Sequence, residues 1–92
     1  MALISKTQIQ SAIESIDCWI YFDNAIHKTI MFDRYMDGIK FVNQLAELAE
    51  ASNHHPDLTV GWCKVGVTFA SHDQGGVTDQ CIAMAQAIDS IL

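Results

Sequence analysis

The hydrophobic pattern of this chain changes repeatedly between the period of a helix and the period of a strand. Apolar residues recur at helical spacing in residues 5–16, 33–53 and 78–92. Between these stretches, residues 19–22 and 25–32, and then 58–60 and 64–70, form short aromatic or β-branched runs joined by turn residues. The pattern predicts the order helix, two strands, helix, two strands, helix.

The ends of the predicted helices carry recognisable signals. Ser5 and Gln8 form a capping-box pattern at the start of the first helix. Asp33 is the predicted N-cap of the long helix and Thr78 that of the last helix. Pro56 forbids continuation of the long helix, which therefore ends just before it.

The apolar positions predict which sides of the elements are buried. On the strand 25–32 we expect Ile26, Ile30 and Phe32 to face inward and His27, Thr29 and Met31 to face outward, with His27 in solvent. The predicted inward positions of the long helix are Tyr35, Met36, Ile39, Phe41, Val42, Leu45, Ala46 and Ala49, and those of the last helix are Cys81, Ala85, Ile88 and Leu92. The expected fold is one α+β domain, residues 1–92, in which a four-stranded antiparallel sheet carries three helices on one face.

Composition excludes several classes of function. With 5 basic and 11 acidic residues the net charge is −6, which disfavours direct binding to nucleic acid. The 3 cysteines include no C-x-x-C pair and indicate a reducing compartment. No signal peptide or membrane-length apolar run is recognisable, so we expect a soluble, cytoplasmic protein without membrane partners.

Two adjacent histidines, His54 and His55, stand between the long helix and Pro56 in the stretch AEASNHHPDLTVGW, residues 49–62. His72 follows the last predicted strand, and the topology of a small sheet can bring it near His54. These imidazoles could bind a metal, exchange protons near neutral pH, or only bond the last carbonyls of the helix. Because histidines at i, i+4 and paired cysteines are both absent, we expect no metal.

The histidines belong to a wider pattern. Glu50, His54, His55 and Pro56 give E-x-x-x-H-H-P, and S-H-D follows at residues 71–73. Its other positions are held by Trp19, the run Ile30-Met31-Phe32-Asp33-Arg34-Tyr35, Ala49, Trp62, Val65, Val67 and Phe69. This pattern resembles that of the pterin-4a-carbinolamine dehydratase family, from about Trp19 to the end of the chain.

The resemblance implies dehydration of 4a-hydroxytetrahydropterin to quinonoid dihydropterin, the step that recycles tetrahydrobiopterin after an aromatic amino acid hydroxylase. It implies His54 and His72 as the acid and base pair and His55 as a residue that orients the pterin substrate. It also implies substrate-binding roles for Glu50, Pro56, Ser71, Asp73, Gln74 and Trp19, and no cofactor. Two of these residues have simpler alternatives, since Glu50 can be a solvated carboxylate at the helix end and Trp19 can belong to the core.

The family also implies partners. Its members form homodimers or homotetramers, one animal member stabilises dimers of a homeodomain transcription factor, and some bacterial relatives act as assembly factors after losing catalytic histidines. A non-enzymatic binding partner, present in the nucleus if it is a coactivator, is therefore the alternative function. The chain departs from the family at Gln80, where a basic residue often stands, and in a first hairpin about two residues shorter than usual.

Overall fold

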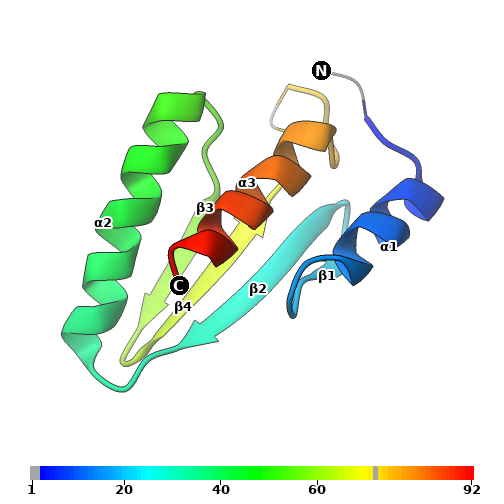
Figure 1. Ribbon diagram of the computed structural model, residues 1–92. Coiled ribbons are helices and arrows are strands. Elements are labelled where there is room, and N and C mark those ends of the chain that lie inside the picture. The colour runs from blue at the N-terminus through cyan, green and yellow to red at the C-terminus, as the bar shows by residue number, and fades with distance from the viewer. Residues whose placement is uncertain (1–2, 72) are drawn as a thin grey trace.

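The computed structural model describes residues 3–71 and 73–92, and these form a sheet with helices on one side (Figure 1). The elements in chain order are α1 (Lys6–Glu14), β1 (Ile20–Phe22), β2 (Ala25–Met31), α2 (Tyr35–Ser52), β3 (Asp57–Gly61), β4 (Lys64–Phe69) and α3 (Asp79–Ser90). All neighbouring strands pair antiparallel, in the spatial order β1-β2-β4-β3. The predicted order of elements and the predicted fold class are confirmed.

Local sequence accounts for the turns and for the start of α1. Ser5 caps α1 and exchanges hydrogen bonds with Gln8, as the capping box requires. Asp23 and Asn24 link β1 to β2 with φ values of 53° and 58°, the backbone of a tight two-residue hairpin turn. Cys63 has a φ of 56° in the corresponding turn between β3 and β4.

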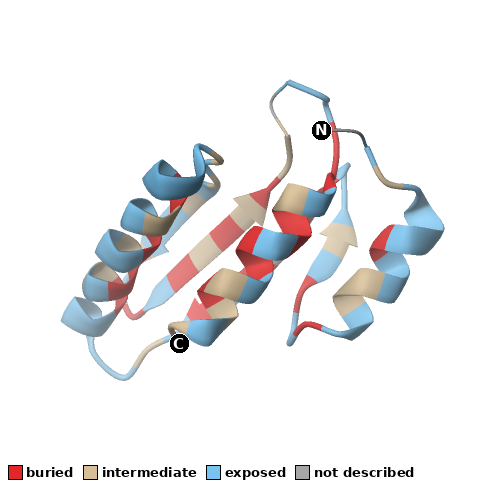
Figure 2. Cartoon of the chain, turned by 45° about the horizontal axis from the view of Figure 1, so that its top comes forward, coloured by how far each residue is buried: buried red, intermediate tan, exposed pale blue. Residues whose placement is uncertain are grey.

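The core lies between the sheet and the helices (Figure 2). Ile26 and Ile30 of β2 face the helices as predicted, while Thr29 and Met31 point to the uncovered face. His27 also lies on that uncovered face, but it is half-buried there. Its Nδ1 is 3.0 Å from Thr68 Oγ1 and its Nε2 is 2.8 Å from the Phe22 carbonyl. The prediction that His27 is solvated is therefore wrong, because a cross-strand neighbour and a hairpin carbonyl satisfy its ring.

The long helix differs from prediction in its start and in its buried side. Its N-cap is Arg34 rather than Asp33, and no side chain caps it. The buried residues are Gly38, Phe41, Leu45 and Ala49. Tyr35, Met36 and Ala46, which were expected inside, are exposed. Apolar residues occur around much of this helix, so the packing against β4 and α3 selects the buried stripe.

Gly38 explains part of that selection. A Cβ at this position would lie 3.3 Å from Phe32 Cδ2 and 3.5 Å from Val65 Cγ2. The missing side chain thus allows α2 to approach the sheet closely, so the glycine that weakens the isolated helix improves its packing. On α3, Cys81, Ala85 and Ile88 are buried as predicted, but Leu92 lies beyond the end of the helix and is 52% exposed.

Candidate functional site

The end of α2 turns the two histidines in different directions. Asn53 adopts a left-handed conformation (φ 48°, ψ 42°), and the His54 amide donates to the Ala49 carbonyl at 3.1 Å. This reversal ends the helix, and β3 starts immediately after Pro56. His54 and His55 consequently leave the helix at a bend, which separates their side chains.

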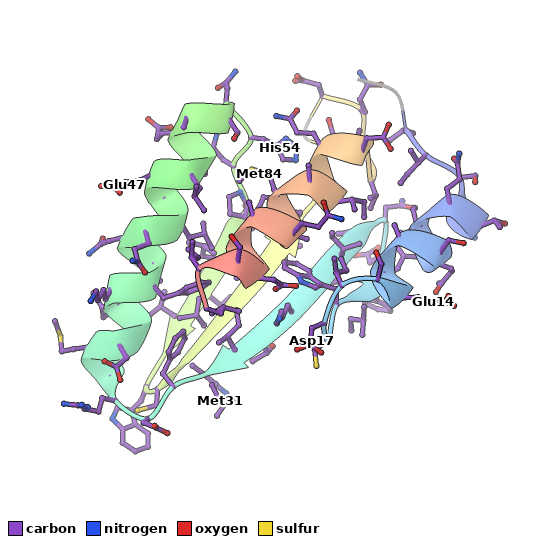
Figure 3. The ribbon with its side chains drawn as sticks, viewed as in Figure 1. Glu14, Asp17, Met31, Glu47, His54 and Met84 are labelled. Atoms are coloured by element: carbon purple, nitrogen blue, oxygen red, sulfur yellow. The ribbon has the colours of Figure 1, made fainter. Side chains whose placement is uncertain are left out.

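His54 is half-buried beside the first turn of α3 (Figure 3). Its ring stacks on Phe69, the last residue of β4, with ring centroids 5.6 Å apart and an interplanar angle of 5°. Its Nε2 lies 3.3 Å from the Sγ of Cys81. The imidazole is therefore held on its face by the sheet and on one edge by α3.

His55 lies in a more open position. Its side chain is 47% exposed, and its Nε2 bonds the carboxylate of Glu50 one turn back along α2. Glu50 stands four residues before His54, which would be one turn on a continuous helix, but the bend at Asn53 pairs it with His55 instead. Glu50 can therefore orient the ring of His55.

The loop between β4 and α3 brings Ser71, Asp73 and Gln74 to the same end of the sheet. Ser71 closes the loop on itself: its Oγ accepts the Gln74 amide at 3.1 Å and its carbonyl accepts the Gly75 amide at 2.9 Å. Gly75 has a φ of 72°, which favours glycine. The predicted residue His72 lies outside the described residues.

Two adjoining hollows open at this place. One of about 260 Å³ is lined by Ser52, Asn53, His54, Ser71, Asp73, Gln74, Thr78 and Gln80. The other, of about 190 Å³, is lined by Asn53, His54, His55, Ala70, Ser71 and Asp73. Four residues are common to both, namely Asn53, His54, Ser71 and Asp73. Five predicted site residues, His54, His55, Ser71, Asp73 and Gln74, thus surround one polar depression that we call the histidine pocket.

Three predicted substrate-binding residues, Trp19, Pro56 and Glu50, do not line the histidine pocket. Trp19 is only 4% exposed, and its Nε1 donates to both Asp89 carboxylate oxygens at 3.1 and 3.2 Å. Lys28 completes this buried cluster, with its Nζ 2.8 Å from Asp89. Trp19 therefore lies in the core, which was the simpler interpretation of its position. Pro56 is half-buried and stands between the bend at the end of α2 and the start of β3.

The sequence alone did not identify five residues of the pocket wall, namely Ser52, Asn53, Ala70, Thr78 and Gln80. Gln80 was noted only as a departure from the family, yet its Nε2 donates to the Ser52 carbonyl at 2.9 Å and ties α3 to the end of α2. Thr78 was predicted as a helix cap, and it also lines the pocket while being fully buried. Ser52, Asn53 and Ala70 carry no sequence signal beyond lying within two residues of His54 or Ser71.

The described residues that line the histidine pocket carry imidazole, hydroxyl, amide and carboxylate groups. Within residues 3–71 and 73–92, no group of three or more His, Cys, Asp or Glu side chains is placed to hold a metal ion.

Cys63 and Cys81 are buried thiols, and Cys18 is exposed. A hydrogen bond to Asp17, together with the negative charge of that carboxylate, raises the pKa of the Cys18 thiol. No helix among the described residues has the length and apolar character that crossing a membrane would take.

The fold and the pocket define the class: a small α+β protein with a histidine pocket where α2, β4 and α3 meet. A family model, Pterin 4 alpha carbinolamine dehydratase, matches residues 2–91. The chain belongs to this family.

Named relatives and solved structures agree with this assignment. The chain is 37% identical over 92 residues to a Mycolicibacterium vanbaalenii protein called "Putative pterin-4-alpha-carbinolamine dehydratase", covering 100% of this chain and 99% of that one. A protein of the same name from Nostoc punctiforme is 37% identical over 89 residues, covering 97% and 96% of the two chains. The crystal structure of a transcriptional coactivator/pterin dehydratase from Brucella melitensis superposes with a TM-score of 0.93 at 30% identity, covering 97% of each chain.

The same fold also occurs in a pterin dehydratase-like protein identified as a RuBisCO assembly factor in the α-carboxysome. It superposes with a TM-score of 0.67 at 22% identity, covering 79% of this chain and 84% of that one. At this identity the likeness concerns the fold alone, and the fold does not fix the function.

Proposed function

We propose that this chain is a 4a-hydroxytetrahydropterin dehydratase, which converts the carbinolamine to quinonoid dihydropterin and water and so recycles tetrahydrobiopterin. The family assignment gives the reaction class. The observation that supports catalysis most directly is the half-buried His54, which stands in a polar hollow together with Ser71 and Asp73.

The reaction asks for two proton transfers and no change of oxidation state. The C4a–O bond breaks as a proton is delivered to the leaving hydroxyl, and a ring nitrogen loses a proton as the new C=N bond forms. Imidazoles suit both steps because their pKa of about 6.5 lets them donate and accept near neutral pH. In this proposal His54 and His72 form the acid and base pair without a metal.

The other pocket residues have supporting roles in this proposal. His55, paired with Glu50, orients the pterin at the mouth of the pocket. Ser71, Asp73 and Gln74 supply hydrogen-bonding groups along its wall, which suits the polar edge of a pterin ring. Trp19 is left out of this set because it is buried in the core.

The test is to generate the carbinolamine in situ with an aromatic amino acid hydroxylase and to follow its decay by ultraviolet absorbance. We expect the wild type to accelerate the decay, and His54→Ala and His72→Ala to lose about 10²- to 10³-fold of that acceleration, since general acid–base catalysis contributes this much. His27→Ala is the matched control, because His27 lies on the uncovered face of the sheet. A folded wild type that leaves the decay unchanged would refute the proposal.

A second candidate function, a non-enzymatic binding partner, is supported by the Brucella melitensis relative, whose name also contains transcriptional coactivator. Large apolar side chains are available for a partner or for a second copy of the chain in a homodimer or homotetramer. Met31, Met36 and Trp62 are 70%, 67% and 82% exposed. If binding is the main role, a His54→Ala variant keeps its partner and its oligomeric state, and the wild type shows no turnover.

A further inference from the structure

Cys81, in the first turn of α3, touches the proposed catalytic histidine. Sequence analysis predicted it only as part of the apolar side of this helix. In the structure its side chain is fully buried, and its Sγ lies 3.3 Å from Nε2 of His54. A buried thiol can act as a weak donor or a weak acceptor of hydrogen bonds. Its contact with an imidazole therefore raises the question of which atom supplies the proton.

The neighbours of the sulfur answer this question. The backbone amide of Thr78 points at Sγ from 3.5 Å, and an amide can only donate. The sulfur is therefore an acceptor on that side. Its own proton has two acceptors within reach, Nε2 of His54 at 3.3 Å and Oγ1 of Thr78 at 3.6 Å. The imidazole nitrogen is both the nearer and the more basic of the two.

We propose that Cys81 is a positioning residue for His54, whose thiol donates a hydrogen bond to Nε2 and holds the neutral ring in the tautomer protonated at Nδ1. This inference rests on the proposed dehydratase function only for its catalytic consequence. The contact itself is a property of the folded chain and can be measured without substrate.

Two contacts with described residues act together on the orientation of this ring. Stacking on Phe69 fixes the plane of the imidazole but leaves it free to rotate within that plane. The hydrogen bond from Cys81 fixes that rotation and the position of the ring proton. A histidine that exchanges a proton with one atom of a substrate needs a fixed ring orientation and a fixed position of the ring proton. In the wrong tautomer, the proton is on the wrong nitrogen.

The first test is nitrogen-15 NMR of the histidine rings in the wild type, at mildly alkaline pH where imidazoles are neutral. Long-range proton–nitrogen correlations distinguish a protonated ring nitrogen from an unprotonated one. We expect Nε2 of His54 to be the unprotonated nitrogen. A proton on Nε2 would overturn the proposal, whatever the catalytic activity of the protein.

The second test uses Cys81→Ala and Cys81→Ser, with Cys63→Ala as the matched control. Cys63 is a second buried cysteine, but it lies in the turn between β3 and β4. Cys81→Ala should lower the share of the tautomer of His54 that is protonated at Nδ1, whereas Cys81→Ser retains a donor and should restore that share. In the decay assay, Cys81→Ala should lower kcat about fivefold with KM nearly unchanged, as expected for the loss of one hydrogen bond.

The outcomes separate positioning from mere packing. Restoration by serine, together with wild-type behaviour of Cys63→Ala, supports the positioning role. A tautomer that stays the same in Cys81→Ala contradicts it, as does a fall in kcat that serine does not rescue. If the wild type has no dehydratase activity, the proposed function fails, while the ring tautomer still decides the role of the thiol.

Discussion

The two ends of α2 lie in contrasting surroundings. At its C-terminal end the chain reverses at Asn53, and the half-buried ring of His54 meets polar side chains from the β4–α3 loop. At its N-terminal end, Met36 and the neighbouring Met31 and Trp62 expose most of their apolar surface. Figure 3 labels His54 and Met31 near these opposite ends. The same sheet therefore supports a half-buried polar pocket at one end and an exposed apolar surface at the other.

The largest expected difference between the two ends concerns stability. Phe69 is fully buried and packs between the rings of Trp19 and His54, so Phe69→Ala should lower the free energy of unfolding by about 3–5 kcal/mol. Trp62 is 82% exposed at the opposite end, and Trp62→Ala should change the free energy of unfolding by less than about 0.5 kcal/mol. Urea denaturation measures the free energy of unfolding of both variants. Similar losses of stability would contradict the contrast between the two ends of α2.

A smaller difference is expected for the ionic contacts at each end of α2. Glu50 bonds His55 near the pocket, and Asp37 lies 3.9 Å from Arg34 at the opposite end of the helix. Both acidic side chains are more than half exposed, so Glu50→Gln and Asp37→Asn should each change stability by less than about 1 kcal/mol.

Turnover should distinguish these two variants. Glu50→Gln removes a charge-assisted partner of a pocket histidine and should lower kcat/KM about tenfold, whereas Asp37→Asn should leave it unchanged. The carbinolamine decay assay gives both numbers. Equal activity of the two variants would mean that Glu50 is only a solvated carboxylate at the end of the helix.

The smallest effect concerns the thiols. Each end of α2 has a buried cysteine nearby, Cys81 beside the histidine pocket and Cys63 in the turn between β3 and β4. Cys18, between α1 and β1, is exposed. Alkylation of the native protein should therefore modify Cys18 first. Because Asp17 raises the pKa of Cys18, less thiolate is present at any pH below that pKa, and the reaction is slowed.

The variant Asp17→Asn tests this explanation. It replaces the carboxylate that accepts the thiol's hydrogen bond and removes its negative charge, both of which raise the pKa of Cys18, so the thiolate fraction and the alkylation rate should rise at neutral pH. The rate should converge with that of the wild type at high pH, where Cys18 is deprotonated in both proteins. Mass spectrometry follows the modification, and an unchanged rate at neutral pH would contradict the role of Asp17.

Much of the fold could be predicted because its signals are local. The capping box at Ser5, the turn residues Asp23 and Asn24, and Pro56 after α2 each restrict only their own neighbourhood. The buried side of α2 could not be predicted in the same way. Apolar residues surround much of that helix, and the close approach permitted by Gly38 selected one stripe among several.

The candidate site shows the same division. The pattern of histidines and the S-H-D segment identified the residues that meet at one end of the sheet, apart from His72, which is outside the described residues. The pattern did not reveal that Trp19 is bonded to Asp89 in the core, nor that Glu50 pairs with His55. These contacts join residues through the packing of elements or through a bend in the chain, and no sequence spacing encodes them.

The sequence by itself determined the order of the elements, the position of the bend after α2 and the family to which the chain belongs, because periodicity, caps and short motifs act over a few residues. Only the tertiary structure decided the contact between Cys81 and His54 and the stacking of that ring on Phe69. Cys81 lies on α3, Phe69 on β4 and His54 in the connection between α2 and β3, so they meet only when α3 packs across the sheet. The side chains that orient the proposed catalytic histidine are therefore set by packing.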